Sequence, residues 1–160
     1  MSQETQEWFV AERARALAMV YLTRRDDLAV VKAGQGIGLE FIVYIRKEDG
    51  ETSVRQFGVF LRGTKGPVTE AHLDKLLSPR MNTLPKQFPY PVCLFHFTMD
   101  DDQGYYTWVA EPAVEDGKPR LVLHNTPHTK KLDSPALDKI VESVDRWYDA
   151  FFAQVAVKAS

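Results

Sequence analysis

The sequence contains a single cysteine, Cys93, among its 160 residues. One thiol cannot form an intrachain disulfide and is too few for a cysteine-rich zinc site, so the fold must be stabilised by packing alone. The chain also lacks a run of about 20 apolar residues, which a membrane-spanning helix needs. Its N-terminus, MSQETQE, is polar and acidic, unlike a secretory signal. These absences predict a soluble, cytoplasmic protein that binds no membrane.

Neither sign of charge dominates the chain. It has 20 Lys and Arg residues against 22 Asp and Glu residues, for a net charge of −2. This balance excludes a general nucleic-acid coat or a polybasic membrane binder, although a local basic patch is compatible with it. Glycine and proline occur nine times each, an ordinary content that excludes disordered and collagen-like classes.

Hydrophobic periodicity predicts helices at both ends of the chain and one in the middle. Apolar residues at spacings of three and four predict a helix over 6–22. Thr69 is a favourable N-cap for a short helix ending at Leu77, since the prolines that follow should prevent its continuation. Ser134 is predicted to cap a C-terminal amphipathic helix over 134–157.

The predicted C-terminal helix has a wide apolar face. Its aromatic residues are Trp147, Tyr148, Phe151 and Phe152. We interpret this face mainly as part of the core. A face of this width could also seal a homodimer or dock on a protein partner.

The remaining apolar runs predict six strands. They cover residues 28–31, 37–46, 53–63, 92–98, 105–111 and 120–124. The Asp49-Gly50 pair between the second and third runs predicts a hairpin. The order helix, three strands, helix, three strands, helix predicts one α/β (α+β) domain over 1–160, with a central mixed sheet flanked by helices.

Two polar residues stand out within the predicted hairpin. Because residues two apart share a face of a strand, Gly38 and Glu40 should lie on one face, together with Phe60 and Arg62 of the partner strand. Glu40 and Arg62 would then end rows of side chains that are otherwise buried.

The same hairpin carries a resemblance to a known family. Gly36-Ile37-Gly38-Leu39 and Val59-Phe60-Leu61-Arg62-Gly63-Thr64 resemble a degenerate form of the pattern Gly-Ile-Asp … Val-Gln-x-Lys-Gly-Thr. That pattern is typical of a bacterial domain family of unknown function within the PD-(D/E)xK, or restriction-endonuclease-like, nuclease superfamily. A leading helix with Ala11-Glu12-Arg13-Ala14, a later apolar strand and an aromatic strand follow in the same order. The resemblance implies a restriction-endonuclease-like core and a place in a bacterial defence or mobile-element system.

The resemblance also implies which residues once formed an active site. In such nucleases, carboxylates and a Gln or Glu hold Mg²⁺, and a Lys helps to position the attacking water. Glu12 matches the helix acid, but Gly38 stands in place of the Asp, Phe60 in place of the Gln and Arg62 in place of the Lys. Glycine and phenylalanine offer no metal ligand, and a guanidinium is a poor proton acceptor. We therefore expect a nuclease-like domain without catalysis or cofactor, acting as a recognition or protein-interaction module.

Two arrangements of the altered site remain open. Glu40 could replace the lost ligand, so that Glu12 and Glu40, with Arg62 or Lys65 as the cation, form a rearranged DNA or RNA nuclease dependent on Mg²⁺ or Mn²⁺. Alternatively, Arg62 could pair with Glu40 or Glu12 in the space of the former metal. A protein partner or a second copy is the expected ligand of a non-catalytic domain, and nucleic acid is a further candidate.

The histidines are interpreted as structural. His124 and His128 are four residues apart, but Thr126-Pro127 places them in a loop rather than on a helix, with no obvious third metal ligand. His96 lies in an apolar strand and is expected to be a hydrogen-bonded core residue.

Overall fold

The computed structural model describes residues 3–34, 38–47, 52–66, 68–85 and 87–159. They form an α+β fold, in which three helices pack on a mixed seven-stranded sheet. The elements are α1 (Gln3–Leu22), β1 (Leu28–Lys32), β2 (Phe41–Arg46), β3 (Thr52–Thr64), α2 (Glu70–Asn82), β4 (Val92–Thr98), β5 (Gln103–Glu115), β6 (Lys118–Leu123), β7 (Lys130–Lys131) and α3 (Ser134–Ala159).

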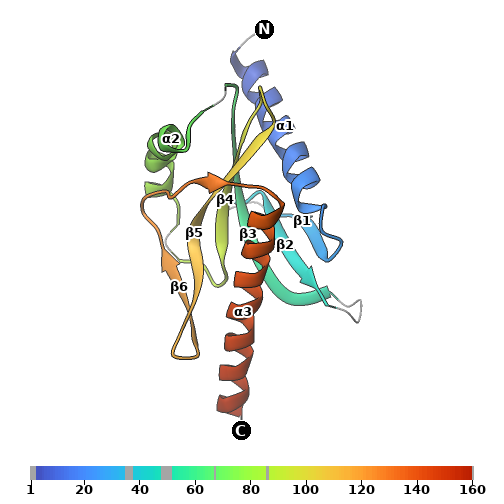
Figure 1. Cartoon of the computed structure of the whole chain (residues 1–160), viewed down its shortest axis with the longest axis vertical. Coiled ribbons are helices and arrows are strands. Elements are labelled where there is room, and N and C mark those ends of the chain that lie inside the picture. The colour runs from blue at the N-terminus through green and yellow to red at the C-terminus, as the bar shows by residue number, and fades with distance from the viewer. Residues whose placement is uncertain (1–2, 35–37, 48–51, 67, 86, 160) are drawn as a thin grey trace.

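The strands follow the chain order across the sheet, from β1 to β6 (Figure 1). β6 pairs with the C-terminal half of β5, and β7 pairs with its N-terminal end, at Tyr105 and Tyr106. β3 and β4 are parallel, with Arg62 opposite His96, whereas the other strand pairs are antiparallel. A parallel pair needs a crossover connection, and the segment containing α2 provides it. β7 is absent from the predicted strand order, because its two exposed lysines carry no hydrophobic pattern.

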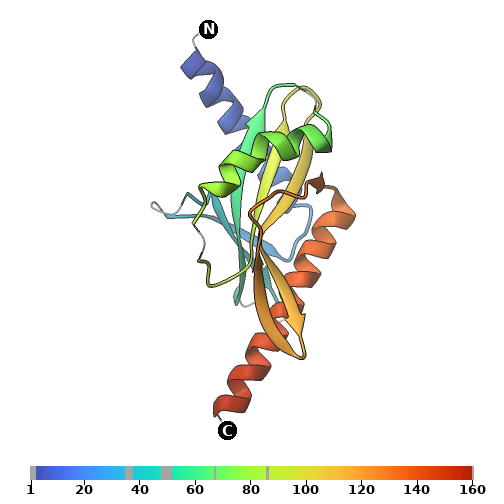
Figure 2. The same cartoon turned by 90° about the vertical axis from the view of Figure 1, so that its left-hand side faces the viewer.

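Each face of the sheet is covered by different helices. The larger core lies under α1 and α3 and includes Phe57, Val59 and Phe95 from the central strands. The smaller core lies under α2, which is in front of the sheet in Figure 2, and includes Phe60 and Leu94. Successive residues of β3 and β4 therefore contribute to opposite cores, as expected for central strands.

α2 is longer than predicted. It begins after Thr69, whose hydroxyl accepts a hydrogen bond from His72 N at 3.1 Å, as predicted, but it continues through Pro79 to Asn82. Leu73, Leu77 and Met81 are buried along one face of the helix. The prediction of a break was wrong because burial of this face outweighs the local cost of one proline, about 3 kcal/mol.

α3 begins as predicted, but a different residue caps it. The Asp133 carboxylate accepts a hydrogen bond from Ala136 N at 2.9 Å, and the Asp133 carbonyl accepts one from Leu137 N at 2.9 Å. Asp133, not Ser134, is therefore the N-cap. Trp147 and Tyr148 are buried, as expected for a core face, whereas Phe151 is 39% exposed.

Among the described residues, none of the helices combines the length and hydrophobicity needed to cross a membrane.

Candidate functional site

A groove of about 650 Å³ lies between α1 and the C-terminal end of β3. The pairing of β2 with β3 ends at Phe41 and Val59, so within the described ranges no strand pairs with the last residues of β3 on that side. α1 covers this part of β3 closely, because a Cβ atom on Gly63 would lie 2.9 Å from Val10 Cγ1. Glu40, Arg62 and Lys65, all predicted site residues, line the groove.

Arg15, a residue that the sequence analysis missed, connects two of the predicted site residues. It extends from α1 into the groove lining, where its Nε donates a hydrogen bond to Glu40 and its Nη1 donates one to Glu12. The Arg15 side chain is 35% exposed and that of Glu40 is 21% exposed, so the pair is partly shielded from water. One guanidinium thus binds both predicted carboxylates through charge-assisted hydrogen bonds, and its single positive charge offsets one of their two negative charges.

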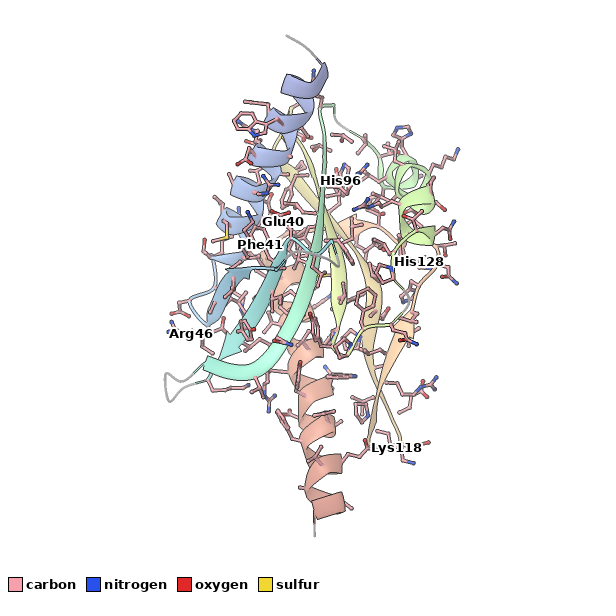
Figure 3. The ribbon with its side chains drawn as sticks, turned by 180° about the vertical axis from the view of Figure 1, so that it is seen from behind. Glu40, Phe41, Arg46, His96, Lys118 and His128 are labelled. Carbon is pink, nitrogen blue, oxygen red and sulfur yellow. The ribbon has the colours of Figure 1, made fainter. Side chains whose placement is uncertain are left out.

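The predicted pairing of Arg62 with these acids was wrong. A guanidinium does lie between Glu12 and Glu40, but it belongs to Arg15. Arg62 follows Phe60 by two residues in β3 and shares its face, the one covered by α2. Glu40 instead contacts Arg15 of α1, and it lies toward that helix in Figure 3.

The reason is a break in the alternation before β2. Residues 38–40 precede the first residue of the strand, and Val59 faces two residues, since it accepts a hydrogen bond from Glu40 N and pairs with Phe41. Leu39 packs in the core under α2, whereas Phe41 packs in the core under α1. Leu39 also lies against Gly58 of β3, because a Cβ atom added to Gly58 would be 3.0 Å from Leu39 Cδ1. Leu39 and Phe41 therefore lie on opposite faces, although strict alternation predicts one face for both.

Two positions of the matched pattern do lie together. A Cβ atom on Gly38 would be 3.5 Å from Phe60 Cε1, so the residues that replace the Asp and the Gln of the pattern are neighbours. Phe60 is 1% exposed and belongs to the core under α2. Neither residue offers an oxygen ligand.

The potential metal ligands are therefore few and already engaged. Glu12 and Glu40 are both bonded to Arg15, and within the described residues no three His, Cys, Asp or Glu side chains form a group that could hold a metal ion. A hard divalent cation prefers several oxygen ligands. To bind here, it would have to displace the Arg15 guanidinium from both carboxylates.

The loop histidines are closer than their sequence context suggested. The rings of His124 and His128 are 5.7 Å apart, and His124 Nε2 lies 2.8 Å from Glu111 Oε1. Glu111 belongs to β5 and pairs with Val122 of β6. The contact ties the loop after β6 to β5 and supports the structural interpretation of these histidines.

Comparison of the chain with protein families, with curated proteins and with solved structures found no match. The function is therefore inferred from the residues of the groove and their charges.

Proposed function

We propose that this protein is a nuclease-like domain without catalytic activity that acts as a recognition or protein-interaction module. The observation that carries the proposal is the bonding of Arg15 to both Glu12 and Glu40. A divalent cation and a guanidinium compete for the same carboxylate oxygens, and the guanidinium stays charged at every accessible pH. On this proposal, Arg15 engages the carboxylate oxygens that a metal cofactor of phosphodiester cleavage would need.

The arrangement of the elements supports a restriction-endonuclease-like core. α1 precedes three antiparallel strands, and α2 then leads into β4, which runs parallel to β3. The two segments that resemble the family pattern are adjacent at Gly38 and Phe60. On this proposal, the resemblance would place the protein in a bacterial defence or mobile-element system.

The surface beside the groove favours a protein partner or a second copy of the chain. Trp8 and Phe9, on α1, are 65% and 52% exposed. Phe9 also lines a shallow depression next to the groove, together with Lys65 and Met99. Exposed aromatic residues with cations around them are typical of protein-interaction surfaces.

A rearranged nuclease is the second candidate function, because Glu40, Arg62 and Lys65 line the same groove. In this alternative, Mg²⁺ or Mn²⁺ bound by Glu12 and Glu40 would activate water, and Arg62 or Lys65 would neutralise the phosphate.

Cleavage and metal binding distinguish the two functions. We expect plasmid, single-stranded DNA and RNA to remain intact with Mg²⁺ or Mn²⁺, and millimolar metal to leave the Tm of the protein unchanged. Light scattering would then detect a dimer or a complex that is weakened by Trp8→Ala. Cleavage that disappears in Glu40→Ala but persists in Glu70→Ala, a substitution on α2, would establish the nuclease instead.

A further inference from the structure

Three basic side chains gather on the face of the sheet that α2 covers. Arg62 and His96 are direct neighbours in the parallel ladder of β3 and β4, so their side chains share this face. Thr64, two residues after Arg62, lies 3.0 Å from His96 Nε2 through its hydroxyl. Arg80 comes from the last turn of α2. In Figure 3, His96 lies beside β3 on the side of α2, whereas Glu40 lies toward α1.

Two polar atoms of this cluster are buried without a partner. His96 is 2% exposed, and its Nδ1 has no hydrogen-bond partner within the described part of the chain. Arg80 Nε is likewise buried and unpartnered there. A buried polar atom that makes no hydrogen bond costs about 1–3 kcal/mol, so two in one cluster call for an explanation.

The cluster also has uncompensated positive charge. Neither Arg62 nor Arg80 forms an ion pair with a carboxylate of residues 3–34, 38–47, 52–66, 68–85 or 87–159. Burial of part of the Arg62 side chain and the nearby charge of Arg80 both lower the pKa of Arg62. The two like-charged guanidinium groups therefore repel each other.

We propose that Arg62, Arg80 and His96 form a binding site for a phosphate group. Two guanidinium groups supply the charge and the forked donors that recognise a tetrahedral oxyanion. The imidazole supplies a neutral donor when its proton is on Nδ1, since Nε2 then accepts a hydrogen bond from the Thr64 hydroxyl. Arg62 is exposed, so phosphate would enter from its side, and a shift of the His96 or Arg80 side chain would bring the buried nitrogens to it. A bound phosphate would satisfy the unpartnered nitrogens and relieve the repulsion.

The site shares Arg62 with the groove described above but differs from it in its other members. Glu12, Arg15 and Glu40 belong to the α1 side, whereas Arg80 and His96 belong to the α2 side. Because Arg80 does not line the groove, Arg80→Gln tests the binding of phosphate without changing a residue proposed for cleavage.

Titration with inorganic phosphate against chloride at constant ionic strength tests the proposal. We expect saturable binding, with a rise in Tm of about 3 °C once phosphate exceeds its Kd about tenfold. In ¹⁵N-resolved NMR spectra, the Arg80 Nε–H resonance should shift along the same binding curve. Arg62→Gln and Arg80→Gln should each weaken binding at least about tenfold, while Lys75→Gln, which removes one charge from the exposed face of α2, should not.

Two further titrations identify the kind of molecule that carries the phosphate group. A nucleoside monophosphate and a short single-stranded oligonucleotide are titrated in the same way. Tighter binding of either one than of inorganic phosphate, lost in Arg80→Gln, would support the site and assign it to a phosphomonoester or a phosphodiester. Absence of saturable binding for all three probes, or equal binding by wild type and a folded Arg80→Gln variant, would overturn the proposal.

Discussion

Arg15 in α1 donates a hydrogen bond from its Nε to the carboxylate of Glu40, which lies 25 residues later and directly before β2. The same guanidinium holds Glu12, one helical turn before Arg15. This arrangement joins α1 to the start of the central hairpin. It also engages the two acids that a metal-dependent site would need, so removal of Arg15 is informative about both stability and function.

Arg15→Gln should destabilise the protein moderately and create an affinity for divalent cations. Because the pair is partly exposed, we expect a loss of about 1 kcal/mol in the free energy of unfolding, measured by urea denaturation. The freed carboxylates should allow millimolar Mg²⁺ or Mn²⁺ to raise the Tm of the variant but not that of wild type.

Arg13→Gln is the matched control for this experiment, because Arg13 lies on the same helix but pairs with Asp102 at 2.8 Å. It should produce no response to metal. An equal response of both variants, or a response in Arg15→Gln that survives the added substitution Glu40→Gln, would contradict the assignment.

Asp133→Ala should destabilise the protein by about 1 kcal/mol, because the first turn of α3 loses the carboxylate bonded to Ala136 N. Ser134→Ala, the change at the residue that the sequence indicated as the cap, should alter the free energy of unfolding much less. Urea denaturation of the two variants compares them directly. A larger effect at Ser134 would show that the cap lies one residue later.

The tight contact between β3 and α1 predicts a steric effect at Gly63. A Cβ atom there would lie 2.9 Å from Val10 Cγ1, so Gly63→Val should force α1 away from the sheet and cost about 2 kcal/mol. Gly66 has no heavy atom within 4 Å of the equivalent Cβ position, and Gly66→Val is therefore the control. Thermal unfolding should separate the two variants by several degrees. Similar Tm values would argue against close packing at the groove floor.

His96 should make the stability depend on pH in the acidic range. Burial, with a smaller effect from the charge of Arg62, lowers the pKa of His96 from 6.5 to about 4 in the folded protein. Between these values the unfolded chain binds a proton that the folded chain does not, so the free energy of unfolding falls as the pH falls from 6.5 to about 4. The total loss from this group is about 3 kcal/mol, and above pH 6.5 its contribution is constant.

Urea denaturation across this pH range measures the effect. His96→Gln keeps a polar side chain beside Thr64 but cannot titrate, so it should reduce the pH dependence by close to one proton. His72→Gln, at an exposed position of α2, should leave the wild-type dependence in place. Identical pH profiles for wild type and His96→Gln would contradict a buried, neutral His96.

Local pattern was sufficient for much of the secondary structure. The periodicity of α1, the Thr69 cap of α2 and the hydrophobic runs of β1, β3 and β4 depend on neighbouring residues, and the structure contains each of them. The end of α2 could not be predicted in this way. Burial of Met81 against the core under α2 decides that the helix passes Pro79, and such burial is a long-range effect.

The candidate site was predicted in part, for a related reason. Spacing and resemblance singled out Glu12, Glu40 and Arg62, and the structure brings Glu12 and Glu40 to one arginine. The arginine that binds Glu40 depends on the backbone just before β2, where both Glu40 N and Phe41 pair with Val59 and the alternation that the sequence predicts is interrupted. Glu40 is thereby turned toward α1 and Arg15, while Arg62 is left with Arg80 and His96 on the other face. Side-chain type is a local property, but the partner of a charge depends on which elements pack together.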